Sequence, residues 1–350
     1  MQTADDQPKD EFVEFDESAL IECSQLMVSQ KGEEAVMQKK SSTREAYGRV
    51  LVKLGKRYPD LVVLDADLSA STKTRDFAKN YPERFFDMGI AEQNMMGTAA
   101  GFALAGKIPC ASTFAVFATG RAYDQVRNAI AYPGLNVKII ATHAGVSVGE
   151  DGASHQTIED ISLMRTLPNM TVIVPADAQE AAQAVAAAIE MQGPVYIRLG
   201  RPAFPEILQE DYRFRIGRAV PLRDGSAAVI FAAGVMVSMA LEAASSLATE
   251  GVEVAVVNVS TIKPLDKETI VQMARKTGAV VTAEEHSIYG GLGSAVAEVL
   301  GENYPVPLER VGIRDRFGES GSPEQLLEVC GLTVKHLVEA VHRAIARSSK

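Results

Sequence analysis

The chain is poor in cysteine, with three among its 350 residues. Cys23, Cys110 and Cys330 lie far apart in the sequence and share no metal-ligand spacing with one another. They therefore do not make the disulfide framework of a small secreted domain. A reducing cytoplasm is the simplest expectation.

The sequence also lacks a long uninterrupted apolar run. Its most apolar stretch, residues 95–120, contains Lys107, Pro109 and several glycines, so no span reaches the roughly 18 apolar residues that a membrane helix needs. We expect a buried helix followed by a strand there. The first residues are acidic and polar, which predicts a chain without a secretory signal.

Basic residues are in short supply as well. The net charge is −10, and residues 1–40 hold ten acidic against four basic side chains. A nucleic acid or an anionic membrane is therefore not expected as the main partner. Apolar residues make up 47% and charged residues 23%, which is typical of a globular protein, and the length suggests two domains.

Strands and helices are expected to alternate from residue 42 onward. The S-x-x-E pattern at residues 42–45 predicts a capping box and a helix that ends at Pro59, and residues 61–64 form a short apolar run typical of a buried strand. A second capping pattern at residues 177–180 opens an alanine-rich helix. Further strands are predicted at residues 136–142, 171–174, 195–199, 227–232, 254–259, 279–283 and 307–313.

These strands show continuous rather than alternating hydrophobicity, which indicates parallel sheets covered on both faces. The predicted fold class is therefore α/β, with two consecutive parallel-sheet domains. The predicted organisation is an acidic N-terminal extension, a first α/β domain, a proline-rich linker and a second α/β domain, at residues 1–40, 41–203, 204–225 and 226–350.

Chemistry is expected beyond the carboxyl ends of the strands, where open parallel sheets bind ligands. Glu92 lies between Gly89 and an apolar helix, where it is either a first-turn glutamate favoured by the helix dipole or a partly buried acid that exchanges a proton. Phe114 and Phe117 lie three residues apart, a spacing that is more often core than a platform for a flat ring.

Residues 143–155 combine glycines with His143 and His155, two of only five histidines, and with Glu150 and Asp151 between them. A metal site is weakly supported because the histidines are far apart in sequence and no cysteine is near. Hydrogen bonding to a polyhydroxylated substrate suits the segment better.

Three arginines, Arg44, Arg198 and Arg201, are candidates for phosphate binding through forked hydrogen bonds, although each is also consistent with a packing role. The glycines at 290–293 lack the G-x-G-x-x-G order of a nucleotide-binding loop. They are predicted to form a strand-to-helix turn.

Five segments, taken together and in this order, resemble the transketolase family. In order of strength they are residues 89–95 (GIAEQNM), 113–125 (TFAVFATGRAYDQ), 142–159 (THAGVSVGEDGASHQTIE), 199–202 (LGRP) and 284–294 (EEHSIYGGLGS). The resemblance covers about residues 42–345. It implies that the first domain is the pyrimidine-binding domain of the family and the second its C-terminal domain.

The resemblance implies that the chain binds the pyrimidine end of thiamine diphosphate. Glu92 would hydrogen-bond the aminopyrimidine and favour the imino tautomer that removes the thiazolium C2 proton, while Phe114 and Phe117 would pack around the ring. A third aromatic of some members falls on Gly120 in this sequence. Asp67 matches an acid near the cofactor at the dimer interface.

The resemblance also assigns substrate positions. Asp151 matches a residue that reads a substrate hydroxyl, and His155 matches one near the reacting carbonyl that would help proton transfer. Four residues match positions that hold the sugar phosphate, namely Arg44, Ser71, His143 and Arg201.

The sequence has no Gly-Asp-Gly, which marks the domain that binds the diphosphate through a metal ion in full-length members. We therefore expect a split enzyme in which a separate N-terminal transketolase subunit supplies the diphosphate site and Mg²⁺ or Ca²⁺. The expected assembly is α2β2 with a homodimeric core, and no metal ligands are expected in this chain. Such a subunit should expose an apolar interface patch when alone.

The predicted activity is transfer of a two-carbon ketol unit from a ketose phosphate to an aldose or aldose phosphate, in pentose-phosphate metabolism or in catabolism of an unusual sugar phosphate. Two alternatives share the architecture, a beta subunit of a 2-oxoacid dehydrogenase and a relative of 1-deoxyxylulose-5-phosphate synthase. The E-D-G-x-S-H loop with Arg201 favours a phosphorylated sugar. A non-catalytic paralogue is a third alternative, against which Glu92, Asp151 and His155 argue.

Overall fold

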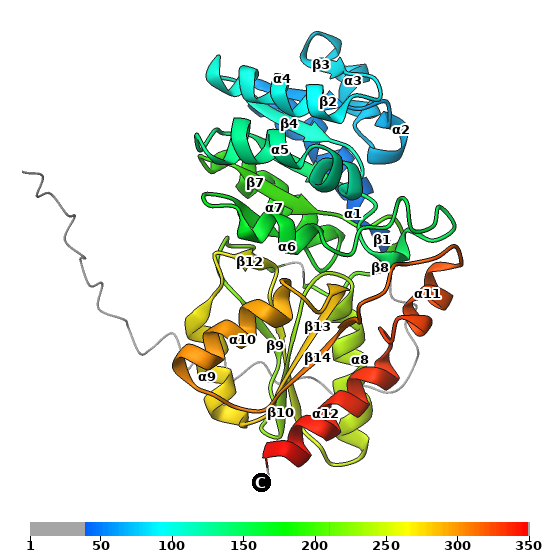
Figure 1. The fold of residues 1–350 in the computed structure, drawn as a ribbon, viewed down its shortest axis with the longest axis vertical. Helices are drawn as coiled ribbons and strands as arrows, with labels where there is room; N and C mark the ends of the chain where they lie inside the picture. The colour runs from blue at the N-terminus through cyan, green and yellow to red at the C-terminus, as the bar shows by residue number, and fades with distance from the viewer. Residues whose placement is uncertain (1–38, 210, 349–350) are drawn as a thin grey trace, which may run out of the picture. The chain divides into compact units, whose positions relative to one another are not determined.

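A computed structural model describes residues 39–209 and 211–348 (Figure 1). The prediction of an acidic N-terminal extension falls almost wholly on residues 1–38, outside the described residues. None of the helices within the described ranges is long and apolar enough to cross a membrane.

The first sheet has seven strands in the order β12-β6-β7-β5-β4-β2-β3. They are β2 (Leu61–Asp65), β3 (Phe85–Asp87), β4 (Ile108–Ser112), β5 (Lys138–Ala141), β6 (Thr171–Ile173), β7 (Val195–Arg198) and β12 (Thr261–Lys263). Every pair is parallel except β12 with β6. The inner strands are buried along their length, which explains their continuous apolar sequence.

Helices cover both faces of this sheet. α1 (Thr43–Arg57) and α7 (Ala178–Glu190) pack against each other over one face, and α4 (Glu92–Leu104) packs on the other. The smaller elements are α2 (Ser69–Thr72), α3 (Arg75–Asn80), η3 (Pro82–Arg84), α5 (Tyr123–Gln125), α6 (Asp160–Thr166), η6 (Val146–Val148), and the π-helical turns η4 (Phe117–Arg121) and η5 (Val126–Ala131).

The second sheet has five strands in the order β14-β13-β10-β11-β9. They are β9 (Val220–Arg223), β10 (Ala228–Ala232), β11 (Val254–Asn258), β13 (Val280–Ser287) and β14 (Leu308–Ile313). Only β9 is antiparallel to its neighbour. Its helices are α8 (Met236–Thr249), α9 (Lys267–Thr277), α10 (Leu292–Asn303), α11 (Pro323–Val329) and α12 (Val334–Ser348).

The predicted α/β class with two consecutive parallel sheets is confirmed, with one antiparallel strand added at an edge of each sheet. β9 falls inside the stretch expected to be a linker, and β12 belongs in sequence to the second half although it extends the first sheet. A separate pair, β1 (Lys40–Ser42) with β8 (Ala203–Pro205), joins the start of α1 to the chain after β7.

Two local predictions need correction. Ser42 is the N-cap of α1, but its side chain makes no capping bond, because its hydroxyl instead donates to the carbonyl of Arg201 at 3.3 Å. α4, predicted to be buried, is exposed along one face at Gly97, Gly101 and Leu104. The second capping prediction is confirmed, since the Asp177 carboxylate accepts from the N–H of Glu180 at 2.9 Å.

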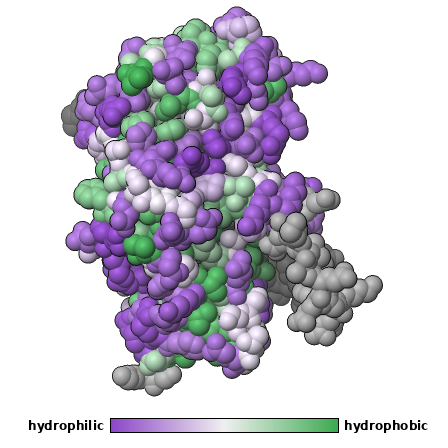
Figure 2. All heavy atoms as spheres, turned by 90° about the vertical axis from the view of Figure 1, so that its right-hand side faces the viewer, coloured by the Kyte–Doolittle hydropathy of each residue, from purple (hydrophilic) through white to green (hydrophobic). Residues whose placement is uncertain are grey.

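The face drawn in Figure 2 is mostly hydrophilic, with hydrophobic patches scattered over it rather than gathered into one continuous area. Large apolar side chains are exposed at several places along the described chain, including the turn before α4, the end of α4 and the segment after η5. They are Ile90, Leu104, Tyr132, Tyr289, Phe317 and Val329.

Candidate functional site

The carboxyl ends of neighbouring strands bring the predicted site residues together. Phe114 follows β4, His143 follows β5 and Arg201 follows β7, and these three strands are adjacent in the sheet. The backbone N–H of Ala115 donates to Thr142 at 2.8 Å, and that of Ala144 donates to Leu199 at 3.2 Å. The segments beyond the three strands therefore lie side by side.

Four rings from these segments form one group. The Phe114 ring stacks on the His143 imidazole with centroids 3.8 Å apart, and it lies parallel to Phe117 at 5.9 Å. His155 meets the edge of Phe117 at 5.5 Å. The structure thus gathers both predicted aromatics and both histidines of the 143–155 segment.

Glu92 is the first residue of α4, and only 3% of it is exposed. A buried carboxylate requires a partner, and Glu92 accepts a hydrogen bond from Arg121 Nη1 at 3.1 Å. The guanidinium carbon of Arg121 also lies 4.5 Å from the centre of the Phe117 ring. Arg121 therefore links the acid to the ring group.

Arg121 was not among the residues predicted from the sequence. It ends the π-helical turn η4, a wider turn than an α-helix and one that is frequent at functional sites. A side chain added at the preceding Gly120 would meet open space, with no atom within 4 Å. The side chain that lies over Phe117 is therefore that of Arg121.

Asp67 is held at a turn beside Glu92's own segment. It adopts a left-handed backbone with φ of 61° after β2, and its N–H donates to the Asp87 carboxylate at 3.1 Å. The same Asp87 oxygen accepts from the N–H of Gly89 at 3.0 Å. Asp87, which sequence reasoning missed, therefore ties the turn of Asp67 to the turn that leads into Glu92.

A cavity of about 410 Å³ is lined by Arg44 and Arg201, two of the three arginines predicted as phosphate-binding candidates. Arg44 Nε donates to the carbonyl of Arg201 at 3.1 Å, and its Nη1 donates to that of Ser71 at 2.8 Å. Ser147 and Val148 also line the cavity. The structure thus brings Arg44, Ser71 and Arg201 together.

Charge and burial set the protonation of His143. Burial lowers the pKa of its imidazole to about 3, and the positive charges of Arg44 and Arg201 act in the same direction. His143 is therefore neutral at pH 7. Its Nδ1 lies 2.9 Å from the hydroxyl of Thr142, which fixes the ring against Phe114.

Acidic side chains of the 143–155 segment share Arg201. Its Nη1 lies 3.5 Å from the Glu150 carboxylate and 3.6 Å from that of Asp151. All three side chains are partly exposed, so an incoming anion could replace these weak pairs at little cost. Glu150 lines the arginine-lined cavity, and Asp151 pairs with Arg201, which lines it as well.

Arg198, one of the three sequence-based candidates for phosphate binding, has a structural role instead. Its side chain is buried, its Nε donates to Asp160 at 2.8 Å, and its Nη2 donates to the carbonyl of Glu285 at 2.8 Å. The protein itself uses this guanidinium. The glycines at 290–293 form the predicted strand-to-helix turn, in which the Glu284 carboxylate accepts from the N–H groups of Leu292 and Gly293.

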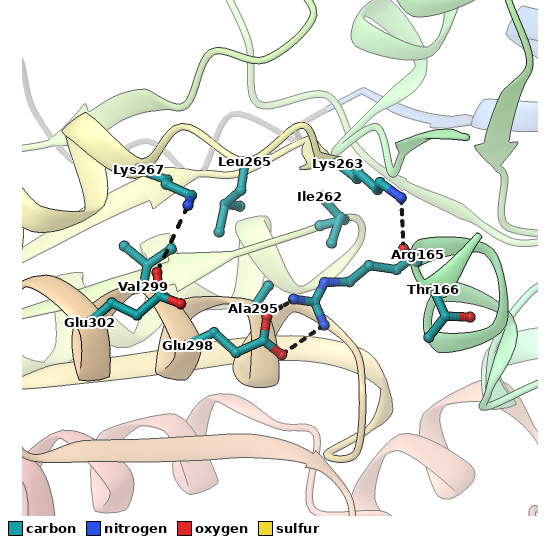
Figure 3. A pocket seen from close by; sticks show the side chains of 10 residues that line it. All are labelled: Arg165, Thr166, Ile262, Lys263, Leu265, Lys267, Ala295, Glu298, Val299 and Glu302. Carbon is teal, nitrogen blue, oxygen red and sulfur yellow. Dashed lines mark hydrogen bonds and ion pairs between the residues drawn. The ribbon is translucent and has the colours of Figure 1, made fainter. Parts of the chain in front are cut away.

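Another cavity, of about 370 Å³, is lined by different residues (Figure 3). Arg165 pairs there with Glu298, Lys263 donates to the carbonyl of Arg165 at 3.0 Å, and Lys267 lies 3.9 Å from Glu302. Its charged side chains are thus bound by protein groups, and it offers no convergent reactive set. Within residues 39–209 and 211–348, no three metal-ligating side chains are placed to hold an ion.

Comparison with known proteins gives matches to both halves of the chain. The model of the transketolase pyrimidine-binding domain matches residues 39–206, and that of the transketolase C-terminal domain matches residues 217–337. A protein named as a transketolase C-terminal section from Methanocaldococcus jannaschii is 49% identical over 85% of this chain and 94% of its own length.

A 6-deoxy-6-sulfo-D-fructose transketolase subunit from Clostridium sp. (strain MSTE9) is 45% identical over 87% of this chain and 95% of its own length. Among solved structures, a split-gene transketolase described as an inactive beta4 tetramer superposes with a TM-score of 0.83 at 59% identity. That match covers 88% of this chain and 99% of the solved one.

Proposed function

Because this chain belongs to the transketolase family, we propose that it is the C-terminal subunit of a split thiamine-diphosphate-dependent transketolase. The reaction proposed is transfer of a two-carbon ketol unit from a ketose phosphate to an aldose or aldose phosphate. The observation that carries this proposal is a buried acid paired with Arg121 beside a group of rings, one of which, His143, feels the charges of the two arginines that line the cavity.

The pyrimidine end of the cofactor fits the residues present. Glu92 is a buried carboxylate beside the ring group, and its partner Arg121 is half exposed. Phe114 and Phe117 would flank the pyrimidine, with Asp67 at the rim. Bound thiamine diphosphate supplies the nucleophilic carbon and the electron sink of the reaction.

The roles of the protein's own groups follow from their positions. Glu92 would hold the proton that is exchanged with the pyrimidine. A carboxylate in a dry site is suited to this role, because burial strengthens its hydrogen bonds. His155, at the edge of the Phe117 ring, would move a proton at the substrate carbonyl. The surrounding rings would exclude water from the reacting atoms.

The sugar phosphate would enter the arginine-lined cavity. Arg44 and Arg201, which are partly exposed, would donate to a phosphate through guanidinium N–H groups that do not already donate to backbone carbonyls. Ser71 lies against Arg44, and Asp151 would accept from a substrate hydroxyl. Neutral His143 can hydrogen-bond the donor without adding charge. This set favours a phosphorylated sugar over the lipoyl-linked chemistry of a 2-oxoacid dehydrogenase.

A partner chain is part of the proposal. Relatives that align over nearly their whole length are named as a C-terminal section, a subunit and a split-gene product. We infer that an N-terminal subunit supplies the diphosphate site with its divalent metal, Mg²⁺ or Ca²⁺, and that the active assembly is α2β2 in the cytoplasm.

The test is calorimetric titration of thiamine diphosphate with magnesium into this chain, into the N-terminal subunit, and into their mixture. The expected result is tight binding only in the mixture, followed by ketol transfer between a ketose phosphate and an aldose phosphate. Tight binding by this chain alone would contradict the divided site. Binding without any ketol transfer would contradict the transketolase activity.

A further inference from the structure

The second α/β unit reaches into the site at the segment that carries His143 and His155. Resting on the proposed function, we propose that Glu285 of β13 is a positioning residue for this segment. It would hold the wall of the arginine-lined cavity in the shape that binds the anionic end of the substrate. Its role would give the C-terminal domain a part in substrate binding.

The contact between Glu285 and the cavity wall is direct. Its Oε1 accepts a hydrogen bond from the backbone N–H of Ser147 at 2.6 Å, although the two residues are 138 positions apart in sequence. Both residues are buried. Ser147 and Val148 line the cavity, and the carbonyl of Val148 accepts from Arg201 Nη1. One carboxylate therefore fixes the backbone next to the carbonyl that orients Arg201.

Glu285 is itself fixed from behind by a buried charge. Arg198 Nη2 donates to the Glu285 carbonyl at 2.8 Å, and Nη1 lies 3.9 Å from its carboxylate. Arg198 in turn donates to Asp160, which also accepts from the Tyr196 hydroxyl at 2.6 Å. Burial raises the pKa of the Glu285 carboxyl, while Arg198 and the Ser147 N–H favour its charged form. The carboxylate has little freedom to leave Ser147.

The segment of residues 143–155 has a glycine at the point where the Glu285 carboxylate comes close to its backbone. A side chain at Gly145 would place its Cβ 2.2 Å from the Glu285 carboxyl carbon, and the residue has a left-handed backbone with φ of 83°. Only glycine meets both conditions without strain. The glycine-rich sequence that suggested a substrate loop is thus, at this position, a requirement of contact with Glu285.

A second set of contacts with the second α/β unit lies at the other end of the segment, at Gln156. Gln156 Nε2 donates to the carbonyls of Gly149 and Glu319, each at 2.9 Å. A Cβ at Gly318 would lie 1.7 Å from Gln156 Oε1, and one at Gly152 would lie 2.7 Å from the Ser320 hydroxyl. The second α/β unit therefore makes hydrogen bonds to both ends of the stretch that carries Asp151. Among the contacts described here, Glu285 is the only charged side chain of that unit that bonds to the cavity wall.

The experiment compares Glu285→Ala with Glu285→Gln in the full-length chain assembled with its partner. For Glu285→Ala we expect KM for a phosphorylated ketose donor to rise about tenfold, the scale of one lost hydrogen bond to a charged group. KM for a small non-phosphorylated ketol donor should change less than about twofold. Glu285→Gln keeps an oxygen that can accept from Ser147 and should restore most of the donor affinity.

Glu284→Ala is the matched control. Glu284 is the neighbouring buried glutamate on β13, and it also accepts backbone hydrogen bonds, but at α10 instead of at the cavity. We expect Glu284→Ala to lower thermal stability without raising KM for the phosphorylated donor more than KM for the non-phosphorylated one. Equal changes in KM for both donors, or the same pattern in Glu284→Ala, would overturn the positioning role.

Hydrogen exchange of the Ser147 amide in the wild-type complex gives a readout that needs neither a variant nor turnover. We expect strong protection, which Glu285→Gln retains. Rapid exchange of this amide would overturn the proposal even if Glu285→Ala fails to assemble. If the Ser147 amide is protected in a wild-type complex that shows no ketol transfer, the proposed function is refuted, whereas the contact between Glu285 and Ser147 is supported.

Discussion

Glu92 combines burial with a partner that can leave. Only 3% of its side chain is exposed, whereas half of the Arg121 side chain is exposed. An exposed arginine loses little when it turns toward water, so the pair can open when another donor reaches the carboxylate. The Glu92 carboxylate is thus buried, while the side chain that pairs with it lies at the surface.

Glu92→Gln is the first prediction at this scale. The change keeps the volume and removes the acid, so we expect the assembled enzyme to fold normally and to lose about 10²- to 10⁴-fold in turnover, the range of a general acid–base contribution. Initial rates and calorimetric binding of thiamine diphosphate provide the measurement. Glu190→Gln, the same change at an exposed ion pair with Arg57, is the control. Near wild-type turnover by Glu92→Gln would rule out the proposed role.

His143 gives a second prediction, on pH. Its pKa of about 3 in the folded chain lies below the value of about 6.5 expected when unfolded, so on acidification the unfolded state takes up the proton first. Stability should therefore fall as pH decreases from about 6.5 toward 3. The contribution of this residue is at most about 1.4 kcal/mol per pH unit.

His143→Asn should flatten this dependence, and asparagine tolerates the left-handed backbone at this position. The measurement is the urea midpoint at pH 7.5 and at pH 5. We expect the wild type to lose about 2 kcal/mol more than the variant over this interval. His342→Asn, on the exposed side of α12, is the control. An unchanged difference in the His143 variant would show that another group dominates the acid response.

Residue identity was predictable where the chemistry lies in a recognisable segment. Glu92, Phe114 and His143 each follow a strand or open a helix within such a segment, so the sequence pointed to them. Arg121 and Glu285 also lie in such segments, and Asp87 lies just before one, but nothing in the sequence singles them out, because the contacts that each makes depend on tertiary packing. Arg121 meets Glu92 across 29 positions, and Glu285 meets Ser147 across 138.

At the scale of the element, α4 has an exposed face that its own chain does not explain. Cβ atoms placed at Gly97 and Gly101 would meet nothing within 4 Å, and Leu104 on the same helix is 76% exposed. Glycine within a helix costs about 0.5 to 1 kcal/mol relative to alanine. Close approach of another chain would account for both glycines.

Gly97→Ala and Gly101→Ala test this explanation. Each should stabilise the isolated chain by about 0.5 to 1 kcal/mol and should weaken assembly with the partner or with a second copy. Denaturant midpoints measure the first effect and sedimentation velocity the second. Gly301→Ala in α10 is the control, because a Cβ there also meets nothing within 4 Å. Stabilisation without any loss of assembly would remove α4 from the interface.

The long elements were predictable and the short edge strands were not. β2, β10 and β11 have five buried residues each, enough for a continuous apolar run to indicate a parallel strand. β12 has three residues and β9 has four, including Pro221, which is too short to show a period. Both strands are specified by the partner strand at the sheet edge rather than by their own sequence.

At the scale of the whole molecule, residues from one half of the chain complete or contact the sheet formed by the other half. β12 lies in the second half of the chain but completes the first sheet beside β6, and Lys263 at its end donates to the carbonyls of Arg165 and Leu167 at 3.0 and 2.6 Å. Arg198 of the first sheet is buried against Glu285 of the second. Neither sheet therefore keeps all of its partners when the other unfolds.

This sharing predicts a single cooperative unfolding transition for the isolated chain. If either unit opened alone, Arg198 would lose a buried partner and β6 would lose an edge strand, and removing one partner of a buried charge network costs about 3 to 5 kcal/mol. Scanning calorimetry should give one peak whose calorimetric and van't Hoff enthalpies agree. Arg198→Met should lower that peak without dividing it, and Arg57→Met, at an exposed ion pair, is the control. Two resolved peaks in the wild type would mean that the units fold independently and that the contacts of β12 and Arg198 add little to stability.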